Sequence, residues 1–311
     1  MKGYLHMNKN DSISSTYLEA TGNIRYNMTN DYMFRVVNQK NQNVTKGIIC
    51  SVLHLNPDYI KSIEITNPIE LGEDIDDKTF VLDVNVLLNN SSIINLEMQV
   101  VNEHNWQDRS LSYLCRSFDQ LYQGETYSSA KPAIHVGFLN FQPFPDYQEF
   151  HATYKLMNSK NSRIYSDKFR LNVVDLTHIN LATDADKESQ LDLWAKFFTA
   201  KTWEDIIMMA EKNPYIAEAA QTLYESNVDE ITEMKCRARR DYYKQKNTTE
   251  KMMRELTEKQ ETLLNEIETL TDEKKKLVDE KEKLTNEKEK LANEKEKLLA
   301  HIKELEKQLN K

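Results

Sequence analysis

Two acidic side chains stand at matching places in the two strongest strand patterns of the sequence. Residues 80–88 read FVLDVNVLL and residues 93–101 read IINLEMQVV, with the turn-forming run Asn-Asn-Ser-Ser between them. Because side chains alternate along a strand, a turn centred on Asn90 predicts that Asp83 and Glu97 lie directly across from each other on one face of the hairpin. Their Cβ atoms would then be ~5 Å apart.

Such a pair of carboxylates can hold a metal ion. Like charges at this separation repel each other, and burial would raise the pKa of at least one of them. A divalent cation between them removes the conflict, and oxygen ligands around a largely hydrated octahedral ion are typical of Mg²⁺ or Mn²⁺. An ion of this kind can polarise a phosphate and lower the pKa of a bound water. The alternative is that both side chains face bulk solvent on a half-exposed hairpin.

The segments around the hairpin alternate between helical and strand patterns. Helical spacing is found at 31–37 and 106–122, a mainly apolar segment at 48–55, and strand patterns at 60–65, 133–141, 150–157 and 169–176. Gly124 stands where a glycine would end the 106–122 helix. This order predicts an α/β fold with a mixed sheet flanked by helices.

Two helical positions near the hairpin could serve the same site. On the 106–122 helix, Arg109 and Tyr113 share a face with Arg116 and Gln120 at 4-3-4 spacing, where they would contact a phosphate backbone or brace the metal. In the competing interpretation this face is simply solvated. Asp31 is either a third acid of the site or the N-cap of its helix.

Several short motifs, taken as a set, resemble those of a known family. They are Asp31-Tyr-Met-Phe, Asp77-Lys78 ahead of Val-Leu-Asp83-Val, Asn95-Leu-Glu97-Met-Gln99, Arg109-Ser-Leu-Ser-Tyr113 and Gly124-Glu-Thr-Tyr127. From about residue 26 to 176, and more loosely through the helical segment that follows, the chain resembles the PD-(D/E)XK nuclease family transposases, the recombination-promoting nuclease group.

The resemblance implies a restriction-endonuclease-like sheet in which Asp83 and Glu97 ligate Mg²⁺, or Mn²⁺, for cleavage of DNA. Gln99 stands where the wider superfamily has a lysine. A glutamine can position a water by hydrogen bonding but brings no positive charge, so Lys78 or Arg109 is expected to supply it. The expected function is a metal-dependent DNA endonuclease linked to recombination or transposition. The alternative is a catalytically decayed nuclease fold that binds DNA or protein.

The C-terminal part predicts one long helix with a leucine seam. From about Asp229 to the end there is no proline or glycine, and the leucines Leu256, Leu263, Leu270, Leu277, Leu284, Leu291, Leu298 and Leu305 recur at strict heptad spacing. Four consecutive lysines occupy the other core position, from Lys274 to Lys295, and would weaken the seam. The pattern favours a weak parallel homodimer, with a solvated single helix as the competing interpretation.

Composition limits the kinds of partner and the cellular compartment that the sequence predicts. The chain of 311 residues has a net charge of −9, so any nucleic-acid contact must be local. It shows no apolar run of membrane-spanning length, no secretory signal and no Cys-x-x-Cys pair, which predicts a cytoplasmic protein.

Five histidines lack the spacing of metal ligands and are expected to be structural: His54, His104, His135, His151 and His178. The domains expected are an arm (1–24), a nuclease-like domain (25–185), a helical segment (186–250) and a coiled coil (251–311).

Overall fold

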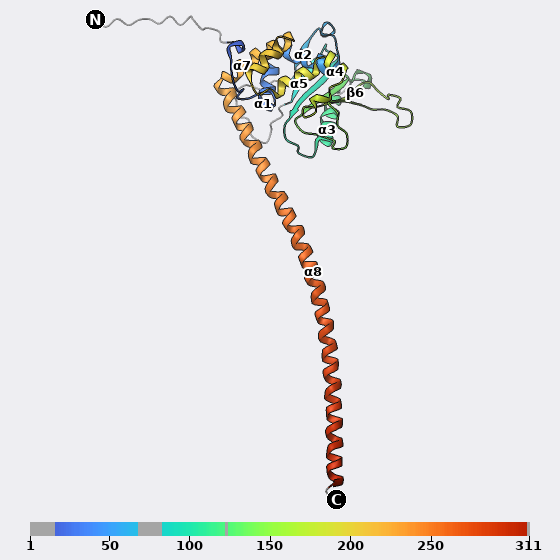
Figure 1. Cartoon of the computed structure of the whole chain (residues 1–311). Helices are drawn as coiled ribbons and strands as arrows, with labels where there is room; N and C mark the ends of the chain where they lie inside the picture. The colour runs from blue at the N-terminus through green and yellow to red at the C-terminus, as the bar shows by residue number, and fades with distance from the viewer. Residues whose placement is uncertain (1–15, 68–82, 122–123, 310–311) are drawn as a thin grey trace, which may run out of the picture. The chain divides into compact units, whose positions relative to one another are not determined.

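The computed structural model describes residues 16–67, 83–121 and 124–309 (Figure 1). Contacts between residues divide the chain into two units, Met1–Tyr243 and Lys244–Lys311. The helices are α1 (Asp31–Lys40), α2 (Gln42–Leu53), α3 (Trp106–Phe118), α4 (Asp184–Glu188), α5 (Leu191–Thr199), α6 (Trp203–Ala210), α7 (Pro214–Val228) and α8 (Glu230–Leu309). The strands are β1 (Ile63–Ile65), β2 (Val84–Leu88), β3 (Ser92–Gln99), β4 (Ala133–Leu139), β5 (His151–Lys155) and β6 (Phe169–Asp175).

Within the described residues, six strands form one mixed sheet in the order β1-β2-β3-β4-β6-β5. The central pairs β3–β4 and β4–β6 are parallel, whereas β1–β2, β2–β3 and β5–β6 are antiparallel. Parallel neighbours need a crossover connection, and α3 provides it between β3 and β4. The predicted mixed sheet with flanking helices and a long C-terminal helix is confirmed.

The turn between β2 and β3 fixes the register of the hairpin. Asn89 and Asn90 both adopt left-handed backbone conformations, with φ of 50° and 53°, which asparagine tolerates better than most residues. The strands therefore pair Asn85 with Asn95 and Val84 with Leu96. This is the register that the sequence predicts, and its continuation sets Asp83 opposite Glu97.

The two faces of the sheet are covered by different elements. One face carries the apolar side chains of the hairpin, such as Val84, Leu96 and Met98, and packs into the main hydrophobic core together with α1, α2, α5, α6 and α7. The opposite face is covered by α3, which contacts β3, β4 and β6. The polar side chains of the hairpin lie on this second face, because residues alternate along each strand.

Helix α3 lies close against the sheet because β4 has a glycine beneath it. A Cβ atom on Gly137 would lie 2.0 Å from Cη2 of Trp106, so any larger residue there would displace the start of α3. Trp106 is buried with Leu139 and Val173 on this face. The helix ends at Phe118 with Asp119 as its C-cap, so the expected capping role of Gly124 is wrong.

Helix α8 begins in the first unit and forms the second. Cys236, near its start, is fully buried in the main core, whereas every leucine of the heptad series is largely exposed, from Leu305 at 47% to Leu284 at 66%. The predicted continuous helix of about 80 residues is confirmed. In the part of the chain described, no helix combines the length and apolar character needed to cross a membrane.

Candidate metal centre

The polar face of the hairpin is buried, not solvated. Asp83 and Glu97 are each 5% exposed, Gln99 is 7% exposed and Asn95 is 1% exposed. The alternative in which the acids face bulk solvent is therefore wrong. Helix α3 covers Glu97 and its neighbours on β3, and Arg109, which it contributes, sets the electrostatics of this face.

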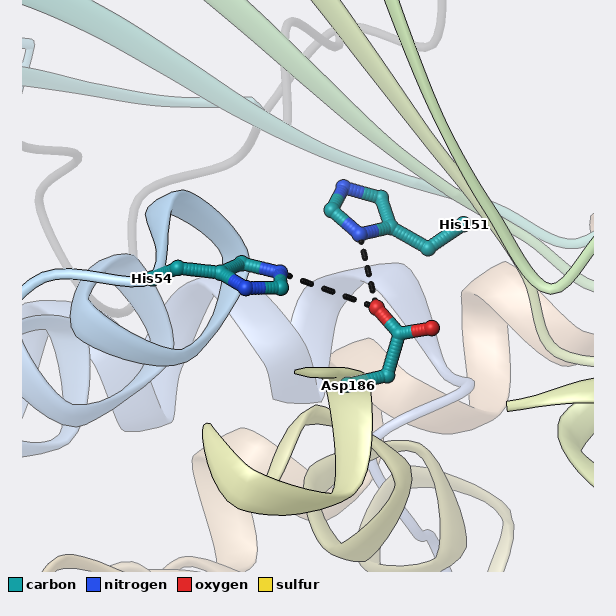
Figure 2. A group of neighbouring side chains, drawn as sticks. All are labelled: His54, His151 and Asp186. Atoms are coloured by element: carbon teal, nitrogen blue, oxygen red, sulfur yellow. Dashed lines mark hydrogen bonds and ion pairs between the residues drawn. The ribbon is translucent and has the colours of Figure 1, made fainter. Parts of the chain in front are cut away.

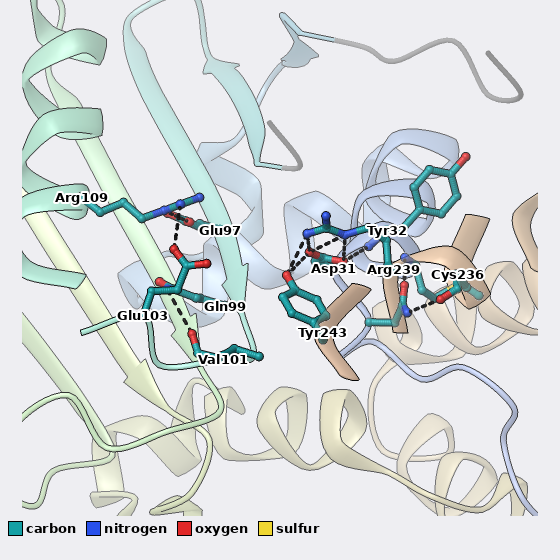
Figure 3. Close-up of polar contacts among 12 residues, drawn as sticks. Asp31, Tyr32, Glu97, Gln99, Val101, Glu103, Arg109, Cys236, Arg239 and Tyr243 are labelled. Carbon is teal, nitrogen blue, oxygen red and sulfur yellow. Dashed lines mark hydrogen bonds and ion pairs between the residues drawn. The ribbon is translucent and has the colours of Figure 1, made fainter. Parts of the chain in front are cut away.

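Glu97, near the C-terminal end of β3, is held by a cation from α3 (Figure 3). Arg109 donates from Nε to Glu97 Oε1 at 2.7 Å, and its Nη1 lies 3.8 Å from Oε2 of Glu103. Burial raises the pKa of Glu97 to about 7; Arg109 acts against this shift and Asp83 adds to it. The carboxylate is thus poised to lose a proton near neutral pH.

Asp83 lies just before β2 and is held by amides. Asn95 Nδ2 donates to Asp83 Oδ2 and, at 2.6 Å, to Asn85 Oδ1, while the buried Arg35 of α1 donates to the Asp83 backbone carbonyl. Burial raises the pKa of the Asp83 carboxyl, and the hydrogen bond from Asn95 and the charges of Arg35 and Arg109 reduce that shift.

The charges of Asp83 and Glu97 both influence the side chain of Tyr113. Each contributes to raising the pKa of Tyr113, whose largest cause is burial, and Asp83 also contributes to the raised pKa of Glu97. Arg109 lies 5.2 Å from the centre of the Tyr113 ring. The hairpin acids, Arg109 and Tyr113 thus form one electrostatic cluster.

Three neighbouring oxygens on β3 have no donor. Asn95 Oδ1, Glu97 Oε2 and Gln99 Oε1 are buried and accept no hydrogen bond from any described residue. They belong to alternate residues and so lie on the same face of the strand. Buried acceptors without a donor are costly, and this row, which includes one oxygen of Glu97 and adjoins Asp83 through Asn95, matches what an oxygen-liganded divalent cation requires. The residues present therefore fit Mg²⁺ or Mn²⁺.

Gln99 and His135 complete this face. Gln99 donates from Nε2 to the carbonyl of Val101 at 3.2 Å, which leaves its Oε1 available as an acceptor. His135 on β4 is fully buried, with Nε2 at 3.6 Å from Glu97 Oε2 and its ring stacked on Tyr113. Burial, with a smaller effect of Arg109, lowers the pKa of His135 to about 3, so the imidazole is neutral.

His135 was missed as a neighbour of the acids because no spacing in the sequence connects it to them. Its contact depends on the parallel pairing of β3 with β4, which sets His135 beside Asn95. One signal was present: in AIHVGFL, histidine and glycine are the two residues that interrupt an otherwise apolar strand. Both lie on the face covered by α3.

Of the two other residues expected to support the site, Asp31 and Lys78, the structure describes only Asp31. Asp31 does not cap α1, because Asn30 is the N-cap and accepts from the Met33 amide at 3.1 Å. Its carboxylate instead accepts hydrogen bonds from Arg239 and, at 2.5 Å, from the Tyr243 hydroxyl of α8 (Figure 3). Lys78 lies outside the described residues.

A comparison with known protein families gives one match. The model of the PD-(D/E)XK nuclease family transposases covers residues 28–252, more than two thirds of the chain, including every strand of the sheet. No curated protein and no solved structure matches the chain significantly. The family match and the mixed sheet with buried acids on its hairpin agree, and the chain belongs to the PD-(D/E)XK nuclease family transposases.

Proposed function

We propose that this protein is a metal-dependent endonuclease that hydrolyses DNA phosphodiester bonds at the Asp83–Glu97 site, as a step in transposition or recombination. Membership of a nuclease family linked to transposition supports the reaction class and DNA as the substrate. The main support for the site is the row of donorless oxygens on β3, one of which belongs to the buried Glu97 carboxylate, together with the buried carboxylate of Asp83. A buried cluster of acceptors alone would be costly, whereas a divalent cation satisfies it.

Each residue of the site has a role that follows from its contacts. Asp83 and Glu97 would hold Mg²⁺, and Mn²⁺ as a substitute, through their carboxylate oxygens. The bound cation would polarise the scissile phosphate and lower the pKa of a bound water. Gln99 would orient the attacking water through Oε1, the acceptor that has no donor among the described residues. Arg109 would supply the positive charge that Gln99 lacks, since its guanidinium already reaches Glu97.

The C-terminal helix would join two copies of the chain. Eight leucines at heptad spacing lie exposed along α8, and a parallel partner helix is what such a seam buries. The four lysines from Lys274 to Lys295 occupy the alternate core position and would keep the association weak. A dimer would bring two nuclease sites to one DNA molecule, which suits a reaction that cuts both strands.

A cleavage assay on supercoiled plasmid tests the nuclease proposal. In Mg²⁺, the wild-type protein should nick or linearise the plasmid, and EDTA should stop the reaction. Asp83→Asn and Glu97→Gln should each lower the rate by on the order of 10²–10³, the usual loss on removing one electrostatic stabiliser. Glu64→Gln is a matched control, because Glu64 is an exposed carboxylate on β1 of the same sheet.

The same assay distinguishes DNA cleavage from the second candidate function, which is DNA binding without cleavage. With Gln99 in place of lysine, the fold could serve only to bind DNA. That function predicts no Mg²⁺- or Mn²⁺-dependent cleavage by the wild type, together with DNA binding that falls with salt. Equal cleavage by wild type and Asp83→Asn would contradict the assignment of the site.

A further inference from the structure

A second cluster of metal-ligating side chains lies apart from the acids of the hairpin. His54 at the end of α2, His151 on β5 and Asp186 on α4 converge, and one ligand atom from each lies within 4.8 Å of the other two (Figure 2). His151 pairs with Val174, which belongs to the main hydrophobic core. The cluster is therefore on the face of the sheet opposite to Glu97.

The distances suit a tetrahedral ion. His151 Nδ1 lies 3.0 Å and His54 Nε2 lies 3.6 Å from the same oxygen, Oδ1 of Asp186. For metal–ligand bonds of about 2.0–2.1 Å, tetrahedral geometry separates neighbouring ligand atoms by about 3.3–3.4 Å. Small side-chain adjustments would accommodate an ion. Two imidazoles and one carboxylate match Zn²⁺ and related transition metals better than Mg²⁺, which prefers oxygen ligands.

The carboxylate is oriented by its own helix cap. Asp186 Oδ2 accepts from the Thr183 hydroxyl at 2.6 Å and from the Thr183 amide at 2.9 Å, which leaves Oδ1 directed at the histidines (Figure 2). Fixed second partners of this kind set the direction of a ligand before the metal arrives. Asp186 is 2% exposed, so the orientation is protected from solvent.

The ligands carry the charges that a metal needs. Burial would raise the pKa of Asp186, but the hydrogen bonds from Thr183 and His151 outweigh it, so the carboxyl titrates below its usual range. Burial and the neighbouring His151 lower the pKa of His54, with Asp186 acting against them. Metal binding requires an ionised carboxylate and neutral imidazoles. The directions of both pKa shifts are compatible with these forms.

Solvent and one more ligand can reach the cluster. His54 lines two cavities, of about 620 Å³ and about 550 Å³, and His151 also lines the second. His54 retains 37% of its side-chain exposure. A site with three protein ligands and access to a cavity keeps its fourth position for water or a small anion.

We propose that His54, His151 and Asp186 bind one ion of the Zn²⁺ class in each chain. The bound ion clamps β5, which is an edge strand of the sheet, to the C-cap of α2 and to the middle of α4. This site is independent of the hairpin acids and of whether the protein cuts DNA. Sequence spacing could not reveal it, because the three ligands come from three separate elements.

Co²⁺ titration of the full-length protein tests the proposal, because tetrahedral Co²⁺ absorbs visible light much more strongly than octahedral Co²⁺. The exposed Cys115 is changed to serine beforehand, to remove an unrelated soft ligand. We expect one equivalent of tetrahedral Co²⁺, displaced by Zn²⁺. The variant His54→Asn, which keeps a residue that tolerates the left-handed backbone at position 54, should weaken binding by more than about 100-fold.

Three controls test whether the Co²⁺ spectrum comes from the cluster of His54, His151 and Asp186. His178→Asn removes a histidine that also pairs with a carboxylate, Asp175 at 2.9 Å, and should leave the Co²⁺ spectrum unchanged. The double variant Asp83→Asn/Glu97→Gln should keep it as well. Zn²⁺ should raise the melting temperature of the wild type but not of His54→Asn. Absence of tetrahedral Co²⁺ in the wild type, equal affinity in His54→Asn, or loss of the signal with the hairpin acids would each overturn the proposal.

Discussion

Arg109 of α3 and Glu97 of β3 form a hydrogen-bonded ion pair of 2.7 Å on the covered face of the sheet. The pair joins the helix to the strand that carries the hairpin acids. It also compensates one of the two carboxylates, so that a single divalent cation would not have to neutralise both alone. The charge balance of the site therefore depends on how α3 is docked.

Removing the Arg109 charge should impair catalysis and move its pH dependence. Without the guanidinium, burial and Asp83 act on Glu97 unopposed, so the pKa of Glu97 rises above its present value of about 7. For Arg109→Ala we expect a rate of plasmid cleavage at pH 7 at least about tenfold lower, and a pH–rate midpoint shifted upward. Arg109→Lys should keep part of the activity, because it keeps the charge but not the fork geometry.

Arg116→Ala is the control for this prediction, since Arg116 is exposed on the same helix and lies 5.8 Å from the Tyr113 ring centre. It should leave both the rate and the midpoint nearly unchanged. An unshifted midpoint in Arg109→Ala would show that Arg109 does not act through Glu97.

Without divalent cations the protein should lose stability as the pH rises from about 4.5 to about 7. The pKa of Glu97 is raised from 4.5 to about 7, so the folded state holds its proton more tightly than the unfolded chain does. The free energy of unfolding therefore falls through this window and levels off above it. At 1.36 kcal/mol per pH unit the loss could reach about 3 kcal/mol.

Urea denaturation in EDTA at several pH values measures this effect. Glu97→Gln should flatten the loss, because a glutamine does not titrate. Addition of Mg²⁺ or Mn²⁺ should stabilise the wild type more at pH 8 than at pH 5, since the cation competes with the proton. If wild type and Glu97→Gln show the same pH dependence in EDTA, Glu97 is not the titrating group.

The close approach of α3 to β4 should make Gly137 intolerant of substitution. In Gly137→Ala the new methyl group would meet the six-membered part of the Trp106 ring, at 2.0 Å from Cη2. Overpacking of this kind typically costs about 1–3 kcal/mol. The cost should appear in the free energy of unfolding, and cleavage should fall because Arg109 is carried by the same helix.

A second substitution can show that the cause is steric. Trp106→Phe removes the ring atoms that would collide with the new methyl group, so the double variant should be less destabilised than the sum of the two single changes. Strict additivity would mean that Gly137→Ala acts by another route.

The first turns of α8 should be needed for folding, and the rest for self-association. Asp31 and Arg239 are nearly buried and paired, and Tyr243 donates to the same carboxylate. A chain that ends after Asn247 keeps these contacts, should melt as the wild type does, and should be a monomer by sedimentation. A chain that ends after Val228 leaves Asp31 without its cation, which costs about 3–5 kcal/mol for a buried pair. Equal self-association of the full-length chain and the longer truncation would contradict a role for the leucine seam.

Much of the fold follows from local patterns. Period-two alternation and the Asn-Asn turn are sufficient to fix the β2–β3 register, because a slip by one residue would expose the apolar set. The absence of glycine and proline after Asp229 is likewise enough for the long helix α8. These features depend on neighbours in the sequence.

The burial and the electrostatics of the site depend on contacts between distant segments. Glu97 is covered by α3, which approaches closely only because position 137 on β4 is glycine, and Asp83 is held by Asn95 and by Arg35 of α1. The partner of Asp31, Arg239, lies 208 residues away. No spacing rule connects such positions. The sequence therefore identifies these side chains as candidates for the site, but it does not predict which residues they contact.

Mn²⁺ binding followed by electron paramagnetic resonance tests most directly whether the two acids share an ion. Free Mn²⁺ gives a sharp six-line spectrum that weakens on binding, so the bound fraction is read without any DNA. The measurement is made in the His54→Asn background, so that the second cluster binds no Mn²⁺. We expect saturable binding that competes with Mg²⁺ and falls sharply when Asp83→Asn or Glu97→Gln is added, while added Glu64→Gln leaves it unchanged. Undiminished Mn²⁺ binding by Asp83→Asn and Glu97→Gln in this background would contradict a shared ion.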